Sequence, residues 1–140
     1  MEINPINNGI VIDHIESGKG LEVYNFLKLS DLDCTIALIQ NVPSKKTGKK
    51  DIIKIDAELT LDFNVMGYIA PQAVINYIKD GKVINKIKVE LPSIVKNVIK
   101  CKNPRCITSV ENVEHVFKLV NKEDRVYRCI YCESQAEKGI

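Results

Sequence analysis

Four of the five cysteines lie in two short pairs near the end of the 140-residue chain. Cys101 and Cys106 are separated by four residues, Cys129 and Cys132 by two, and 22 residues separate the pairs. Two such pairs can place four thiolates at the corners of a tetrahedron, as in a closed structural zinc site. Two disulfides or an iron centre are the alternatives, but no secretory signal is visible at the start of the sequence. We predict one structural Zn²⁺ per chain, with no coordination position open for catalysis.

The segment around these cysteines predicts a second, smaller domain. Residues 93–140 carry a net charge of +3, whereas residues 1–92 carry −1. Pro92 lacks a backbone donor and favours an extended residue before it, so Leu91-Pro92-Ser93 is the best boundary. A domain of about 45 residues buries little apolar area and usually needs a metal or disulfides. We therefore expect a domain at 1–92 and a small, β-rich, zinc-binding domain at 93–140.

The first domain alternates between strand and helix patterns. Asp80-Gly81 between two β-branched runs is a strong hairpin signal. The lysine-rich run 43–50 is expected to be a solvated loop. Strands are expected at 10–15, 35–42, 51–57, 73–79 and 82–89, and helices at 21–29 and 61–70. This order, β-α-β-β-α-β-β, predicts an α+β protein with a ferredoxin-like split βαβ domain and one added strand.

Polar residues on these strands form a candidate binding site. Lys54 lies on the polar face of the third strand and Lys86 on the last strand. In a split βαβ sheet these strands can converge with Asp13 and His14 at the end of the first. Asp13 could accept hydrogen bonds from ribose hydroxyls, while His14 and the two lysines meet phosphates. A solvated strand face is the alternative for each lysine.

Enzymatic function is not expected. No P-loop, G-x-G-x-x-G or convincing nucleophile–base set occurs. Asp13 and His14 are adjacent in a strand and should point to opposite faces, which argues against a catalytic dyad. Cys34 is expected to be a small buried hydrophobe. No apolar run is long enough to span a membrane, so we expect a cytoplasmic protein without a membrane partner.

Nucleic-acid binding is the main alternative function, through a zinc-ribbon or translation-related factor. Such a protein would present a basic, aromatic ribbon face. Only 6% of the residues are aromatic and the chain has no Trp. One Zn²⁺ with four thiolates carries a charge of −2, which lowers the net charge of the second domain from +3 to about +1. We therefore expect no nucleic-acid partner.

Several motifs taken together resemble the regulatory chain of aspartate carbamoyltransferase, the allosteric subunit of that pyrimidine-pathway enzyme. The resemblance covers residues 3–133. It rests on residues 9–15 (GIVIDHI), 41–44 (NVPS), 48–55 (GKKDIIKI), 70–73 (APQA) with Asn76, Leu91-Pro92, the first cysteine pair with Asn103 and Ile107, and the second pair with Glu133.

This resemblance implies a non-catalytic subunit that binds CTP, UTP or ATP on its first domain and a catalytic chain through its zinc domain. By matched position, Asp13 would meet the ribose, and His14, Lys54 and Lys86 the triphosphate. Asn103 would face the catalytic chain. Residues implied to line the base and sugar pocket are Ile3, Ile6, Val11, Asn76, Ile78 and Val83. Family members pair as regulatory-chain homodimers, and three pairs join two catalytic trimers.

Overall fold

The computed structural model describes residues 6–46 and 48–136, and Ile3 lies outside this part. The chain divides into two compact units, Met1–Glu90 and Leu91–Ile140. The predicted boundary falls two residues further along, after Pro92. Within the described residues, no helix combines the length and apolarity that crossing a membrane requires.

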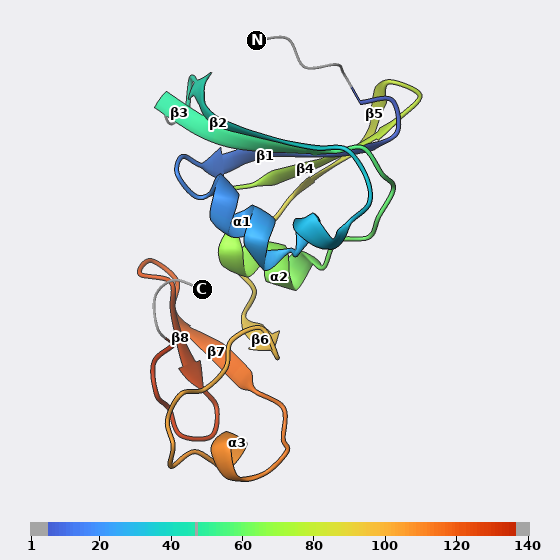
Figure 1. Cartoon of the computed structure of the whole chain (residues 1–140). Helices are drawn as coiled ribbons and strands as arrows, with labels where there is room; N and C mark the ends of the chain where they lie inside the picture. Colours follow the sequence, from blue (N-terminus) through green and yellow to red (C-terminus); the bar gives the residue numbers. More distant parts are fainter. Residues whose placement is uncertain (1–5, 47, 137–140) are drawn as a thin grey trace. The chain divides into compact units, whose positions relative to one another are not determined.

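The first unit is built on a five-stranded antiparallel sheet with the order β2-β3-β1-β4-β5 (Figure 1). Strand β1 is central, and β2 and β5 are the edges. The strands are β1 (Gly9–Glu16), β2 (Ile36–Ser44), β3 (Gly48–Ile55), β4 (Val74–Lys79) and β5 (Lys82–Lys88). With helices after β1 and β3, this arrangement confirms the predicted α+β class and split βαβ order.

Two α-helices and a 3-10 turn cover one face of this sheet: α1 (Gly20–Phe26), η1 (Leu29–Asp31) and α2 (Phe63–Ile69). The covered face carries the core, in which Ile10, Ile12, Ile53, Ile55 and Ile75 are fully buried. Alternate residues on these strands point to the opposite, open face. This open face therefore carries the polar side chains of β1, β3 and β4.

Two elements have bounds in the structure that differ from those predicted from the sequence. The loop within the run 43–50 is shorter than predicted, because β2 continues to Ser44 and β3 starts at Gly48, with Lys45 and Lys46 in the turn between them. Pro43 is tolerated there because β2 is an edge strand and needs no outward donor. The first helix ends before the predicted residue 29, since Lys28 adopts a left-handed conformation (φ 54°) and starts a separate turn.

The second unit contains the three-stranded sheet β6-β7-β8 and one short helix. Its elements are β6 (Ile94–Lys96), α3 (Ile107–Val110), β7 (Val116–Asn121) and β8 (Val126–Cys129). Its buried core is small and centres on Val95, Phe117 and Tyr127. A core of this size is what the sequence predicts for a domain that needs a metal.

The segment that joins the units is fixed on both sides. The N–H of Val89 donates to the carbonyl of Ala73 in the first unit (3.2 Å). In the second unit, the buried Tyr127 hydroxyl donates to the carbonyl of Pro92 (2.6 Å). Only residues 90 and 91 lie between these two attachments.

We expect Tyr127→Phe to lower the free energy of unfolding of the second unit by about 0.5–1.5 kcal/mol, because it leaves the Pro92 carbonyl without its donor. Denaturant unfolding of the zinc-saturated protein measures this change. Tyr131→Phe is the matched control, since the Tyr131 side chain is exposed. Equal stability of the two variants would show that the Tyr127 hydrogen bond contributes nothing measurable.

Candidate functional site

The candidate metal centre is formed by two tight turns. In the first turn, the N–H of Cys106 donates to the carbonyl of Asn103, and Asn103 Oδ1 accepts from the N–H of Arg105. In the second, which follows β8, the N–H of Glu133 donates to the carbonyl of Cys129. Both turns present their cysteine side chains inward, so the four thiols converge.

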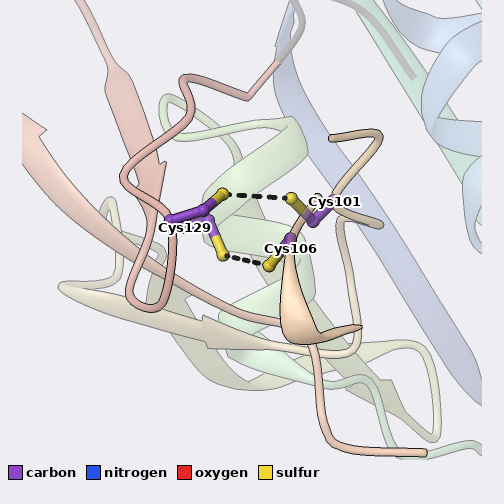
Figure 2. Close-up of side chains that lie close together, drawn as sticks. Cys101, Cys106 and Cys129 are labelled. Atoms are coloured by element: carbon purple, nitrogen blue, oxygen red, sulfur yellow. Dashed lines mark hydrogen bonds between the residues drawn. The ribbon is translucent and has the colours of Figure 1, made fainter. Parts of the chain in front are cut away.

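The sulfur geometry fits a tetrahedral zinc ion. The Sγ atoms of Cys101 and Cys132 are 3.6 Å apart, and those of Cys106 and Cys129 are 3.7 Å apart. All four lie within 4.8 Å of one another, and Figure 2 shows the labelled thiols facing each other. A ZnS₄ tetrahedron with Zn–S bonds of about 2.3 Å has S–S edges of about 3.8 Å. The S–S bond of a disulfide is about 2.05 Å long, so these sulfur–sulfur distances suit a metal ion rather than two disulfides.

The surroundings give the four thiols different acidities. Hydrogen bonding with the side chain and backbone of Ser134 lowers the pKa of Cys132 to about 6. Burial raises the pKa of Cys101 to about 12. Burial also raises the pKa of Cys129, whereas hydrogen bonding with Thr108 lowers that of Cys106. Because a metal binds thiolates, loading must release protons, and acid should favour metal loss.

On the first unit, the predicted lysines and their neighbours form one row across the open face. Lys54 on β3 pairs with Val11 on β1, Val11 with Asn76 on β4, and Asn76 with Lys86 on β5. Lys86 is exposed and the other three are half-buried. The sheet therefore brings together four of the residues that the sequence analysis singled out.

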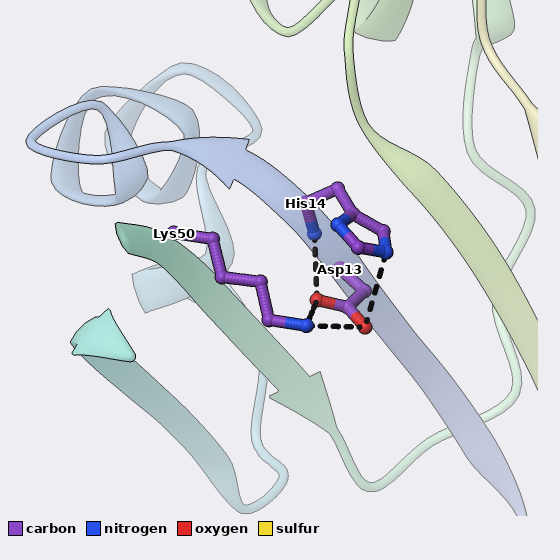
Figure 3. A network of polar contacts seen from close by, with 3 residues as sticks. All are labelled: Asp13, His14 and Lys50. Atoms are coloured by element: carbon purple, nitrogen blue, oxygen red, sulfur yellow. Dashed lines mark hydrogen bonds and ion pairs between the residues drawn. The ribbon is translucent and has the colours of Figure 1, made fainter. Parts of the chain in front are cut away.

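The prediction that Asp13 and His14 point to opposite faces is wrong. A β-bulge interrupts the β1–β3 pairing between Ile12 and Ile15, and His14 has φ 56°. The bulge turns the His14 ring toward Asp13, and its Nε2 lies 3.9 Å from Asp13 Oδ2 (Figure 3). Asp13 Oδ1 also accepts from the His14 N–H at 2.6 Å. The two side chains thus contribute to one polar cluster.

Lys50 is a member of this cluster that the sequence analysis missed. Its Nζ lies 3.0 Å from Asp13 Oδ1 and 3.3 Å from Oδ2 (Figure 3). The sequence analysis placed Lys50 in a solvated loop, whereas it lies in β3. The even spacing between Lys50 and Lys54 could have put both on the same face of that strand.

A cavity of about 580 Å³ opens at the His14 end of the sheet. Its basic lining comes from His14, Lys46, Lys86 and Lys88. Lys46 and Lys88 were not predicted as site residues. Three lysines beside a half-buried histidine make this cavity suited to an anion.

Of the predicted base-pocket residues, Val11 and Asn76 belong to the row across the open face, whereas Ile6, Ile78 and Val83 lie toward the other end of β1. Ile78 pairs with both Gly9 and Val83, and Ile6 contacts the space that a side chain at Gly9 would fill. The N–H of Gly81, at the hairpin tip, donates to the carbonyl of Asn7 (2.9 Å). The sheet thus has an apolar end near Gly9 and a basic end near His14.

Comparisons with known proteins agree with this two-part arrangement. Residues 1–90 match the family model described as "Aspartate carbamoyltransferase regulatory chain, allosteric domain", and residues 93–140 match the one described as "Aspartate carbamoyltransferase regulatory chain, metal binding domain". The chain belongs to the family of aspartate carbamoyltransferase regulatory chains. The match favours this family over the nucleic-acid-binding alternative, and it confirms the predicted resemblance.

Curated relatives named aspartate carbamoyltransferase regulatory chain span nearly the same length. The chain is 51% identical to the relative from Clostridium acetobutylicum over 134 residues, which is 95% of this chain and 92% of that one. It is 51% identical to the relative from Clostridium tetani over 95% and 94% of the two chains. The relative from Bifidobacterium longum is 41% identical over 98% and 99%.

We expect Cys129→Ser to abolish zinc binding and to unfold the second unit, because metal ligation supplies the folding energy that its small core lacks. Zinc content per chain and the amide NMR spectrum measure the two effects. Cys34→Ser is the control, since Cys34 is half-buried against the core of the first unit. A metal-free Cys129→Ser protein with an intact second unit would refute this dependence.

Proposed function

We propose that the chain is a non-catalytic, cytoplasmic allosteric subunit that binds nucleotide effectors and regulates aspartate carbamoyltransferase catalytic chains in de novo pyrimidine biosynthesis. Residues 1–92 would form the effector domain and residues 93–140 the zinc domain. The observation that carries the proposal is the family match, joined to the row of site residues on the open face of the first unit.

The effectors in this proposal are CTP, UTP and ATP. The triphosphate would meet His14, Lys54 and Lys86 at the basic end, and the ribose would meet Asp13. Asp13 is held by Lys50, so its oxygens have a fixed direction. The base and sugar would lie beside Val11 and Asn76 in the row across the open face and beside Ile6, Ile78 and Val83 nearer Gly9. Ile3 is the remaining residue proposed for this pocket.

The zinc domain would bind the catalytic chain. Four large apolar side chains near the metal-binding cysteines are exposed, which supports a protein-binding surface there: Ile107, Val110, Ile130 and Tyr131. Asn103, the proposed contact residue, donates to Ser134 Oγ at 3.3 Å and is therefore oriented by the metal-binding loops. Regulatory chains would pair as homodimers, with three pairs joining two catalytic trimers.

We expect Lys54→Ala to weaken CTP and ATP binding at least tenfold, because one charge-assisted phosphate contact contributes about 1.5–3 kcal/mol. Calorimetry on the zinc-loaded chain gives both dissociation constants. Lys118→Ala removes the same charge from an exposed strand position in the second unit and should bind normally. Unchanged affinity in Lys54→Ala would assign this lysine to a solvated strand face instead.

The second experiment tests regulation. Added to its catalytic trimers, the chain should make their response to substrate depend on nucleotide, with a coupling free energy of about 1–3 kcal/mol. Asp13→Ala should remove this dependence while the complex still assembles, because only effector binding is lost. Steady-state kinetics and size-exclusion chromatography measure the two properties. Nucleotide hydrolysis by the purified chain, or a complex that ignores every nucleotide, would contradict the proposal.

A further inference from the structure

Asp51 is a fully buried carboxylate that the proposed nucleotide site does not use directly. Its Oδ2 accepts from the N–H groups of Gly18 (3.1 Å) and Gly20 (2.9 Å), and its Oδ1 accepts from the N–H of Asn41 (3.0 Å). A buried charge is stable only when its hydrogen-bonding capacity is met, as these three donors achieve.

The three donors belong to two segments on either side of β3. Gly18 lies in the turn that follows β1, Gly20 is the first residue of α1, and Asn41 lies in β2. The packing at Gly20 is close, since a Cβ there would lie 2.8 Å from Asp51 Oδ2. Asp51 therefore connects the exit of β1 to β2 through one side chain.

Both strands next to β3 are bulged at this level. In β1, Asp13 and His14 occupy the bulge between Ile12 and Ile15, and Ile15 pairs with Asp51 itself. In β2, the bulge lies between Ile39 and Val42 and includes Asn41, which has φ 60°. Asp51 is thus hydrogen-bonded to the bulge in β2 and to the turn that follows the bulged end of β1.

The neighbour of Asp51 completes the connection to the candidate site. Successive strand residues point to opposite faces, so Asp51 is buried under the sheet while Lys50 projects onto the open face. There Lys50 Nζ pairs with Asp13. The hydrogen bonds of Asp51 therefore hold the backbone that carries Lys50. They also hold the turn at Gly18, four residues after His14.

We propose that Asp51 is a positioning residue for the phosphate end of the nucleotide site: it anchors the bulged end of β1 so that Asp13, His14 and Lys50 face one ligand. This inference rests on the proposed function. Asp51 touches no nucleotide and acts through the backbone of the bulge. Its loss should therefore affect the phosphate and ribose contacts at this end more than the contacts to the base.

Asp51→Asn tests the proposal in the full, zinc-loaded chain. The amide keeps one accepting oxygen, but its NH₂ group cannot accept, so either the Gly18 and Gly20 N–H groups or the Asn41 N–H loses its acceptor. We expect CTP to bind about tenfold more weakly and cytidine to lose less affinity, because cytidine keeps only the ribose contact of Asp13 and has no phosphate for His14. Asp56→Asn is the matched control, since Asp56 is exposed and directly follows β3.

NMR titration gives both dissociation constants and also the ring resonances of His14. The His14 resonances should shift in Asp51→Asn and stay in place in Asp56→Asn. Unchanged CTP affinity in Asp51→Asn, or equal losses for CTP and cytidine, would overturn the proposal. If the wild-type chain binds no nucleotide, the proposed function fails by itself, and the His14 resonances still decide whether Asp51 positions the bulge.

A second variant keeps the test decisive if Asp51→Asn does not fold. Ser17 Oγ donates to Asn41 Oδ1 at 2.9 Å and joins the same turn to the same bulge from the exposed side. Ser17→Ala should weaken CTP binding about two- to threefold and cytidine binding less, as expected for loss of one neutral hydrogen bond. Wild-type CTP affinity in this variant, with Asp51→Asn unfolded, would overturn the positioning role.

Discussion

The pairing of β1 on both its sides is the constraint on which the first unit depends. Because β1 is central, its inward residues Ile10 and Ile12 lie in the middle of the core, and its outward residues lie in the middle of the open face. The bulge at Asp13 and His14 interrupts the pairing of β1 with β3, and the pairing resumes at Ile15 and Asp51. The core and the candidate site therefore lie on opposite faces of the same strand, β1.

The second unit depends on a different kind of contact. Few side chains are buried there, and four sulfur atoms take the place of a larger apolar core. A metal–thiolate bond is directional, so it also sets the shape of the two turns that carry Ile107 and Ile130. We expect the exposed apolar side chains near the cysteines to lose their defined positions when the metal is removed.

The sequence was sufficient where short spacings determine structure, and it failed where hydrogen bonds between strands do. Cysteine spacing predicted the metal cluster, and alternation placed Lys54 and the buried isoleucines on opposite faces. Lys50, the bulge at His14 and the role of Asp51 depend on partners 10 to 37 residues away. One signal was available for Asp51, because it is a charged residue that shares its strand parity with Ile53 and Ile55.

The linker between the two units is short, and its length has a physical consequence. Val89 is fixed in the first unit and Pro92 in the second, which leaves a tether of two residues, about 7 Å when extended. A linker of two residues has only a few free backbone torsions, and its end-to-end distance can change little. The length of this tether limits the distance between the end of β5 and Pro92, whatever orientation the second unit takes.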